Sequence, residues 1–208
     1  MYPRRFRFTS NNLGRDVTLA LMFDSPAGGS LDQKFFPVCW KVLTFAAHGI
    51  SSAAFEYEGR TGFFEAEISD RHVIPQRAAS CEPGQRVIIT NEHDIVVGSG
   101  VPGVIQCVNQ TDAPIHIGVG LFSDGGSRHV QPIYLWRDIQ VRTTVSVEFT
   151  PILSIYATRD YGEREMIKLP IELPVIYKQN ILDLDSREIE YTVSFNHATG
   201  LVEISREN

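Results

Sequence analysis

The stretch Ile115-His-Ile-Gly-Val-Gly-Leu-Phe122 places an aliphatic side chain at every second position. Side chains alternate between the two faces of a β-strand, so this spacing gives one continuous apolar face and predicts a half-buried strand. A second apolar stretch, Val130-Gln-Pro-Ile-Tyr-Leu-Trp136, follows a turn that contains glycine at 124–126. Short strands separated by such turns are typical of a β-sandwich or a β-barrel.

The same period of two recurs along the whole chain, and no window of twelve residues carries a capped apolar stripe of period 3.6. Turn residues separate the strands at 24–29, 58–62, 82–84, 98–100, 124–126 and 196–200. We therefore predict an all-β protein, an antiparallel two-sheet sandwich that is Ig-like or jelly-roll-like, in which residues 1–208 form a single domain. The strands are predicted at 16–23, 36–45, 52–58, 63–69, 86–91, 94–98, 103–109, 115–122, 130–136, 143–149, 151–157, 173–178, 189–195 and 201–205.

Three local patterns make sharper predictions. The segment 35–45 is apolar on both alternating faces and predicts one central strand. A turn centred on Arg60-Thr61 predicts a hairpin over 52–69 with Glu56 opposite Glu65. At the C-terminus, strands at 190–195 and 201–204 flank a five-residue loop and predict a second hairpin, whereas 71–85 is expected to be a loop.

Composition limits the environment and the partners. The 208 residues are 43% hydrophobic, enough for a sizeable core, and the three cysteines are widely spaced without a zinc-type pairing. Buried free thiols of this kind favour a reducing compartment, so we expect a soluble, cytoplasmic protein without a membrane span. A net charge of −6, with basic residues scattered along the chain, argues against nucleic acid as a partner.

A candidate ligand surface contains Tyr134 and Trp136, which share one face of their strand and are followed by Arg137. Exposed aromatic rings beside polar groups are typical of sites that stack on a sugar or another flat ligand. His116 could line a groove next to these residues, because the strand glycines Gly118 and Gly120 permit close approach. The alternatives are that both aromatic residues belong to the core and that the glycines accommodate a bulky neighbour.

A second candidate site is the polar face of the predicted 52–69 hairpin, which carries Glu56, Glu58, Glu65 and Glu67. Carboxylates clustered in this way could hold a metal such as Ca²⁺, with Glu56 and Glu65 as ligands, or act as the acid and base of a hydrolase or lyase. A solvated outer face explains the same pattern. No nucleophile elbow, phosphate loop or zinc motif is present, and no particular cofactor is indicated.

Four patches of the chain carry a resemblance: Phe36-Pro-x-x-Trp40-Lys-Val-Leu, Ile117-Gly-Val-Gly-Leu-Phe122, Phe149-Thr-Pro-Ile-Leu-x-x-Tyr156 and Val193-Ser-Phe-Asn-x-Ala-Thr-Gly200. In these patches the sequence resembles a family of small intracellular fungal β-rich proteins. The resemblance implies a non-secreted β-sandwich. It implies no activity and no site residues.

The function favoured by the sequence is that of a non-enzymatic binding module, lectin-like or defence-type, for a glycan or another small ligand. One alternative is a carboxylate-based hydrolase or lyase, with or without a metal. The other is a structural or interaction protein that forms a homodimer through a sheet edge or an apolar patch. A sandwich fold is compatible with all three functions.

Overall fold

The computed structural model describes residues 3–26, 34–92, 95–123, 129–168 and 171–207. The described chain is nearly all β-structure, and its one helical element is the 3₁₀ turn η2 (Ile181–Asp183). None of the described residues forms a helix long and apolar enough to cross a membrane. The strands are β1 (Arg4–Asn11), β2 (Val17–Phe23), β3 (Phe35–Pro37), β4 (Lys41–Phe45), β5 (Ile50–Tyr57), β6 (Thr61–Ser69), β7 (His72–Ser80), β8 (Gln85–Ile89), β9 (Ile95–Ser99), β10 (Ile105–Asn109), β11 (Ile115–Phe122), β12 (Val130–Ile139), β13 (Thr144–Val147), β14 (Ile152–Ala157), β15 (Tyr177–Asn180), β16 (Glu188–Asn196) and β17 (Leu201–Arg206).

The described strands form four sheets, with the orders β17-β16-β1-β5, β15-β14-β2-β4, β3-β12-β11-β6-β7 and β13-β10-β8-β9. Most neighbours are antiparallel, but β1 pairs with β16 and β8 with β10 in parallel. The prediction of an all-β fold is confirmed. The sheets are four rather than two and do not close into a barrel.

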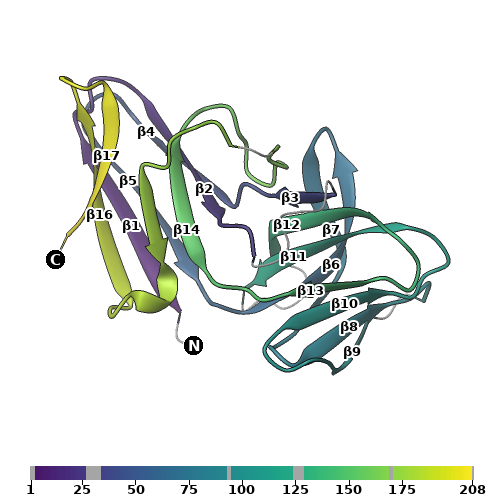
Figure 1. Cartoon of the computed structure of the whole chain (residues 1–208). Helices are drawn as coiled ribbons and strands as arrows, with labels where there is room; N and C mark the ends of the chain where they lie inside the picture. The colour runs from purple at the N-terminus through teal and green to yellow at the C-terminus, as the bar shows by residue number, and fades with distance from the viewer. Residues whose placement is uncertain (1–2, 27–33, 93–94, 124–128, 169–170, 208) are drawn as a thin grey trace.

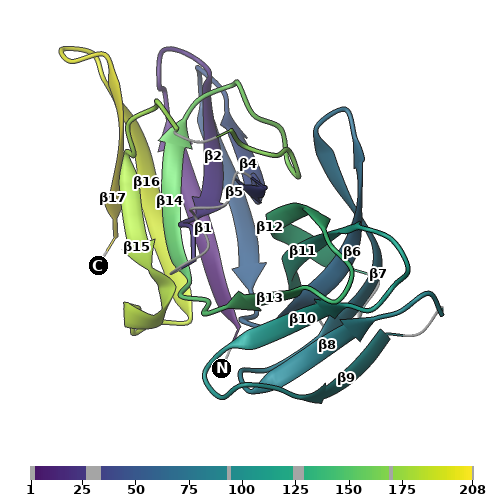
Figure 2. The ribbon, with the colours of Figure 1, turned by 45° about the vertical axis from the view of Figure 1, so that its right-hand side comes forward.

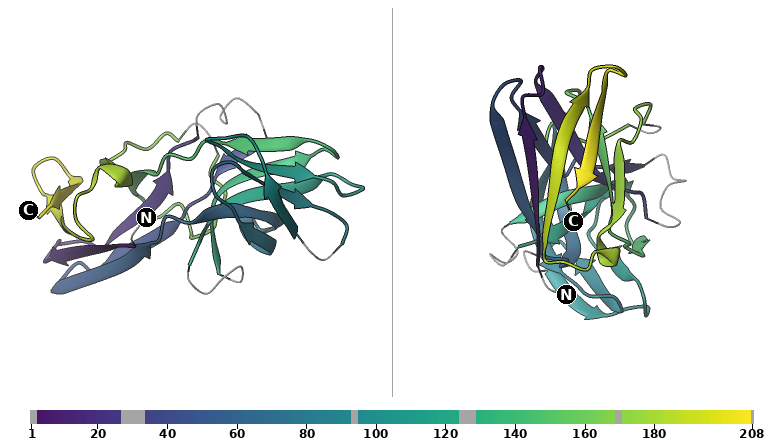
Figure 3. Two further views of the ribbon diagram at one scale, coloured as in Figure 1. Left: turned by 90° about the horizontal axis from the view of Figure 1, so that it is seen from below. Right: turned by 90° about the vertical axis from the view of Figure 1, so that its left-hand side faces the viewer.

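The four sheets are arranged in two halves. Figure 1 shows the sheets of β1 and β2 in one half and the sheets of β11 and β8 in the other, and the turned view in Figure 2 shows the same division. The view from below in Figure 3 shows both chain termini on the half that contains β1. The chain enters the second half for β3, returns for β4 and β5, and enters it again for β6–β13.

One cluster of buried residues contains side chains from all four sheets. Its centre is a row of aromatic rings that joins the two halves: Phe55 to Trp40 at 4.9 Å between ring centroids, Trp40 to Phe23 at 5.0 Å, Phe23 to Phe149 at 5.5 Å, and Phe149 to Tyr134 at 6.1 Å. Aromatic pairs at these separations contribute packing energy beyond their buried area. The two halves therefore share a hydrophobic core.

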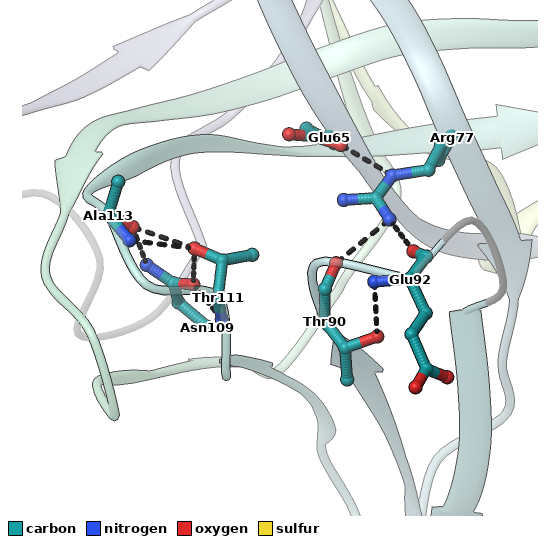
Figure 4. A network of polar contacts seen from close by, with 7 residues as sticks. All are labelled: Glu65, Arg77, Thr90, Glu92, Asn109, Thr111 and Ala113. Carbon is teal, nitrogen blue, oxygen red and sulfur yellow. Dashed lines mark hydrogen bonds and ion pairs between the residues drawn. The ribbon is translucent and has the colours of Figure 1, made fainter.

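The second half also contains two polar networks (Figure 4). Arg77 on β7 donates to the carboxylate of Glu65 at 2.7 Å and to the carbonyl of Thr90 at 2.8 Å, and it also contacts the carbonyl of Glu92. β7 and β8 belong to different sheets, so Arg77 connects these two sheets through the loop that follows β8. The second network is built around Asn109, at the end of β10.

Most strands lie within a few residues of their predicted positions, and 115–122 coincides with β11. Two strands were not predicted. β1 lies in the basic N-terminal segment, where Phe6 and Phe8 face the core, and β7 replaces the loop expected at 71–85.

The prediction of one central strand over 35–45 is wrong. β3 pairs with β12 and β4 pairs with β2, so the chain crosses from one half to the other between them. The backbone amide of Val38 donates to the carbonyl of Ile133, and that of Trp40 donates to the carbonyl of Leu21, both at 2.9 Å. The segment is apolar throughout because Phe35 and Trp40 pack in the shared core, whereas Val38 and Cys39 pack in two smaller hydrophobic clusters.

The C-terminal hairpin is confirmed, with β16 and β17 paired from Asn196↔Leu201 onward. The 52–69 hairpin is wrong, because β5 pairs with β1 whereas β6 pairs with β7 and β11. Parts of the predicted turn at 24–29 and the whole of the turn at 124–126 lie outside the described residues.

Candidate functional site

A cleft of about 430 Å³ opens where β2 ends. Binding sites for small ligands usually have volumes of roughly 300–1,000 Å³ and are mainly apolar with a few convergent polar groups. This cleft has that character. It is lined by Met22, Phe23, Asp24, Ser25, Pro37, Ser154, Tyr156 and Ile171.

The polar residues that line the cleft are Ser154 and Tyr156 on β14 and the two residues after the end of β2, Asp24 and Ser25. Lys178 on the neighbouring strand β15 reaches the cleft through its ion pair with Asp24. Ser154 on β14 lies opposite Lys178 on β15 and opposite Met22 on β2, so these side chains share one face of the sheet. Tyr156 follows two positions later on the same face. The flanking residues Leu153 and Ile155 point to the other face and belong to the shared core.

The face that carries Ser154 and Tyr156 has a small apolar cluster of its own. Ala20, Met22 and Tyr156 pack there with Cys39 and Ile167, and Ile171 adds a partly buried contact. Ile167 and Ile171 therefore cover part of this face of the sheet. Ile171 also lines the cleft, so the polar groups of the cleft lie beside apolar side chains.

Asp24 is the centre of the polar network in the cleft. Ser154 Oγ donates a 2.6 Å hydrogen bond to Asp24 Oδ1, and Lys178 Nζ forms an ion pair with Asp24 Oδ2. Ser154 is buried, whereas the side chains of Asp24 and Lys178 are 29% and 55% exposed. The carboxylate is thus held in place from below and remains open to solvent on one side.

The backbone of Asp24 is also fixed. Its amide donates to the carbonyl of Ile152 at 2.9 Å, and its carbonyl accepts a hydrogen bond from the hydroxyl of Tyr134. Burial, with a smaller contribution from the Asp24 carboxylate, raises the pKa of Tyr134, so its hydroxyl stays protonated and continues to donate. A group held from both sides is preorganised to contact a ligand.

Tyr156 adds a second hydroxyl to the cleft. Burial raises the pKa of Tyr156, and the nearby Asp24 and Tyr161 raise it further, whereas its hydrogen bond with Ser154 lowers it. The phenol is therefore neutral at physiological pH and can donate or accept a hydrogen bond. The cleft therefore presents a carboxylate and neutral hydroxyls beside apolar side chains, and the ammonium group of Lys178 is paired with that carboxylate.

The structure places Tyr134 and Trp136 in the core rather than on the surface. Tyr134 has an exposed fraction of 0% and Trp136 one of 6%, and both rings pack on Phe35. The prediction that they form an open stacking surface is wrong, because the face of β12 that carries them is covered by the shared core. Tyr134 contributes to the cleft indirectly, through its hydrogen bond to Asp24.

His116, near the start of β11, and Arg137, near the end of β12, do not line the cleft. The amide of Asp138 donates to His116 Nδ1 at 3.1 Å, and the guanidinium of Arg137 lies 5.9 Å from the ring centre of Phe36. The groove expected beside Gly118 and Gly120 is filled. A β-carbon on Gly118 would come within 2.1 Å of the Phe64 ring, so these glycines accommodate a bulky neighbour.

The predicted metal site is not assembled. Glu56 on β5 lies opposite Arg5, whereas Glu65 on β6 belongs to another sheet and is paired with Arg77. Within the described ranges no group of three or more His, Cys, Asp or Glu side chains is placed to hold a metal ion. The pairing of Glu56 with Glu65 depended on the 52–69 hairpin and is wrong with it.

The sequence reasoning missed Asp24, Ser154 and Lys178. One weak signal was present: Ser154 interrupts the apolar run Ile152-Leu-Ser-Ile-Tyr156, and a hydroxyl within a buried strand requires a partner. In the sequence, Asp24 is the first residue of a predicted turn. Their meeting depends on the register of β2, β14 and β15, which local sequence does not specify.

Comparison with models of protein families, with curated proteins and with solved structures found no match.

Proposed function

We propose that this protein is a non-enzymatic binding module that takes a small polyhydroxylated ligand, such as one sugar residue of a glycan, in the Asp24 cleft. The single observation that supports this most is the Asp24 carboxylate, which is fixed by Ser154 and Lys178 and still partly open to solvent. A carboxylate accepts hydrogen bonds from ligand hydroxyls, and hydrogen bonds to a charged acceptor are the stronger ones.

The remaining groups suit the same class of ligand. The Lys178 ammonium group donates hydrogen bonds, and the Tyr156 hydroxyl can donate or accept one. Hydrogen-bond donors and acceptors therefore lie close together, as the hydroxyl groups of a sugar require. The walls formed by Met22, Pro37 and Ile171 match the apolar C–H face of such a ligand. Binding is favoured over catalysis because Ser154, the nucleophile type nearest to the carboxylate, is buried beneath it.

A thermal-shift screen with monosaccharides and disaccharides tests the proposal. A sugar at 100 times its dissociation constant should stabilise the protein by about 2.7 kcal/mol and raise the melting midpoint by roughly 5–10 °C. Asp24→Asn and Tyr156→Phe should each reduce this shift. Tyr177→Phe, a matched control whose hydroxyl faces Gln179 and Tyr191, should keep it.

Two results would count against the proposal. One is the absence of a shift with every sugar tested. The other is a shift that neither Asp24→Asn nor Tyr156→Phe reduces, because the ligand would then bind outside the cleft.

A further inference from the structure

Strand β9 forms one edge of the sheet β13-β10-β8-β9 and pairs only with β8 among the described strands. Its side chains are unusually exposed for apolar residues: Val96 is 53% exposed and Val97 is 40% exposed, and Val101 just beyond the strand is 54% exposed. The sequence from Ile95 to Val104 contains no charged residue. An uncharged apolar edge is a template for pairing with another strand.

The other long edge strands carry residues that oppose such pairing. β7, which lies close to β9, contains Pro75 and Arg77. β5 and β17 contain Glu56 and Glu203. Among the short edges, β3 contains Pro37, whereas β4 and β15 contain Lys41 and Lys178. Proline and charge on an edge are the usual protection against aggregation. β9 has neither.

The last edge, β13, also lacks charge and proline but differs in what it exposes. It is four residues long, its valines Val145 and Val147 are buried, and its exposed side chains are Thr144 and Ser146. Among the described edges, β9 is therefore the one that combines an unprotected backbone with exposed β-branched apolar side chains.

The backbone pairing identifies which groups of β9 are available. The amide of Gly100 donates to the carbonyl of Gly84 at 2.8 Å, in the same register that pairs β9 with β8. In an antiparallel pair, residues alternate between those bonded to the neighbour and those whose N–H and C=O point away from it. The outward groups on β9 therefore belong to Ile95, Val97 and Ser99.

We propose that β9 pairs with β9 of a second copy of this chain, antiparallel and centred on Val97. The outward groups at 95, 97 and 99 are symmetric about Val97, so a two-fold axis there matches Ile95 of one copy with Ser99 of the other. This is the self-complementarity that an isologous dimer requires. The two copies each carry a net charge of −6, and the uncharged strand keeps like charges out of the seam.

The second copy is a better occupant than a charged extended peptide, because β9 offers a peptide no counter-charge. The seam itself is small, one short strand per copy, and stable complexes usually bury about 1,200 Å² or more. The dimer should therefore dissociate on dilution. The dimer joins the β-sheets of two copies at β9. No residue of β9 lines the Asp24 cleft, so the dimer does not depend on ligand binding there.

Sedimentation velocity over a range of concentrations tests the proposal. The unmodified protein should shift from monomer to dimer as its concentration rises. Val97→Lys and Val97→Glu should each remain monomeric, since the register places two like charges directly opposite each other. An equimolar mixture of the two variants should recover the dimer. Val175→Lys, which changes a valine of similar exposure outside any strand, should dimerise as the unmodified protein does.

Recovery in the mixture also excludes unfolding as the cause of dissociation, because unfolded chains would not reassociate in a one-to-one pair. The proposal is overturned if the unmodified protein is monomeric at the highest concentration. It is equally overturned if Val97→Lys dimerises normally, or if folded Val97→Lys and Val97→Glu, checked by circular dichroism, fail to associate when mixed.

Discussion

Ser154 on β14 donates a 2.6 Å hydrogen bond to the carboxylate of Asp24, a residue 130 positions earlier in the chain. The bond fastens the end of β2 to β14 and fixes the acceptor at the mouth of the cleft. Because Ser154 is buried, its hydroxyl is removed from water and donates to the Asp24 carboxylate instead. The same hydrogen bond therefore contributes to the stability of the fold and to the position of the carboxylate in the proposed site.

Ser154→Ala should lower the free energy of unfolding by about 1–3 kcal/mol, because a buried hydrogen bond to a charged group is lost. Urea denaturation measures the change. Ser194→Ala, an exposed serine on β16, is the control and should change stability by less than about 0.5 kcal/mol. If the two variants were equally stable, the bond between Ser154 and Asp24 would contribute nothing to folding.

Asn109→Ala should destabilise the protein more strongly, by about 3 kcal/mol. The buried amide of Asn109 donates to the carbonyls of Ala113 and Ile139 at 3.0 and 2.9 Å, and its oxygen accepts from Thr111 (Figure 4). Removing the side chain leaves these buried groups without partners. Urea unfolding measures the change, and Gln110→Ala, at the neighbouring exposed residue, is the control. Similar unfolding midpoints for the two variants would refute the prediction.

The period of two was sufficient to place most strands but not to pair them. β5 and β6 both have an apolar face and are joined by a turn with glycine, and yet they belong to different sheets. β5 pairs with the distant strand β1, and β6 pairs with the distant strand β11 as well as with the next strand, β7. The sequence pattern does not predict β7, because Pro75 and Arg77 interrupt the alternation of apolar and polar residues that indicates a strand. Both residue types are common in edge strands.

His116 should make stability depend on pH. Burial lowers the pKa of His116 below 6.5; Asp138 raises it and Arg137 lowers it. The folded state therefore binds the proton less readily than the unfolded state, so stability falls as the pH decreases from about 6.5 towards the folded pKa. Protonation of Nδ1 would also break the hydrogen bond from the Asp138 amide.

The measurement is the free energy of unfolding of the unmodified protein and of His116→Gln between pH 5 and 8. The difference between the two should widen below pH 6.5 in the direction of a relatively more stable variant, because glutamine takes up no proton. Parallel curves across this range would show that His116 does not contribute.

The three cysteines should react slowly with thiol reagents in the folded protein. Burial raises the pKa of Cys39 and of Cys81 to about 12 and raises that of Cys107 well above its usual value. Because the thiolate is the reactive form, little of it exists at pH 8. Ellman's reagent should modify the native protein slowly and all three thiols rapidly in denaturant, whereas rapid native labelling would indicate that one thiol is accessible.

The candidate site illustrates a second limit of the sequence. Tyr134 and Trp136 are aromatic residues near polar groups, and only the packing of β12 shows that they face the core. Asp24, Ser154 and Lys178 carry no signal in the sequence because Asp24 follows β2 whereas Ser154 and Lys178 lie on β14 and β15, and the register of these strands brings them together. Single residues suggested chemistry, but tertiary pairing decides which of them meet.

The most direct test of the proposed function is to map amide chemical shifts by NMR while titrating the sugar that stabilises the protein best. We expect saturable changes that cluster at Asp24, Ser25, Ser154, Tyr156 and Ile171, with weaker binding in Asp24→Asn. Saturable changes that cluster elsewhere, or the absence of saturable change at these residues, would contradict the assignment of the Asp24 cleft as the binding site.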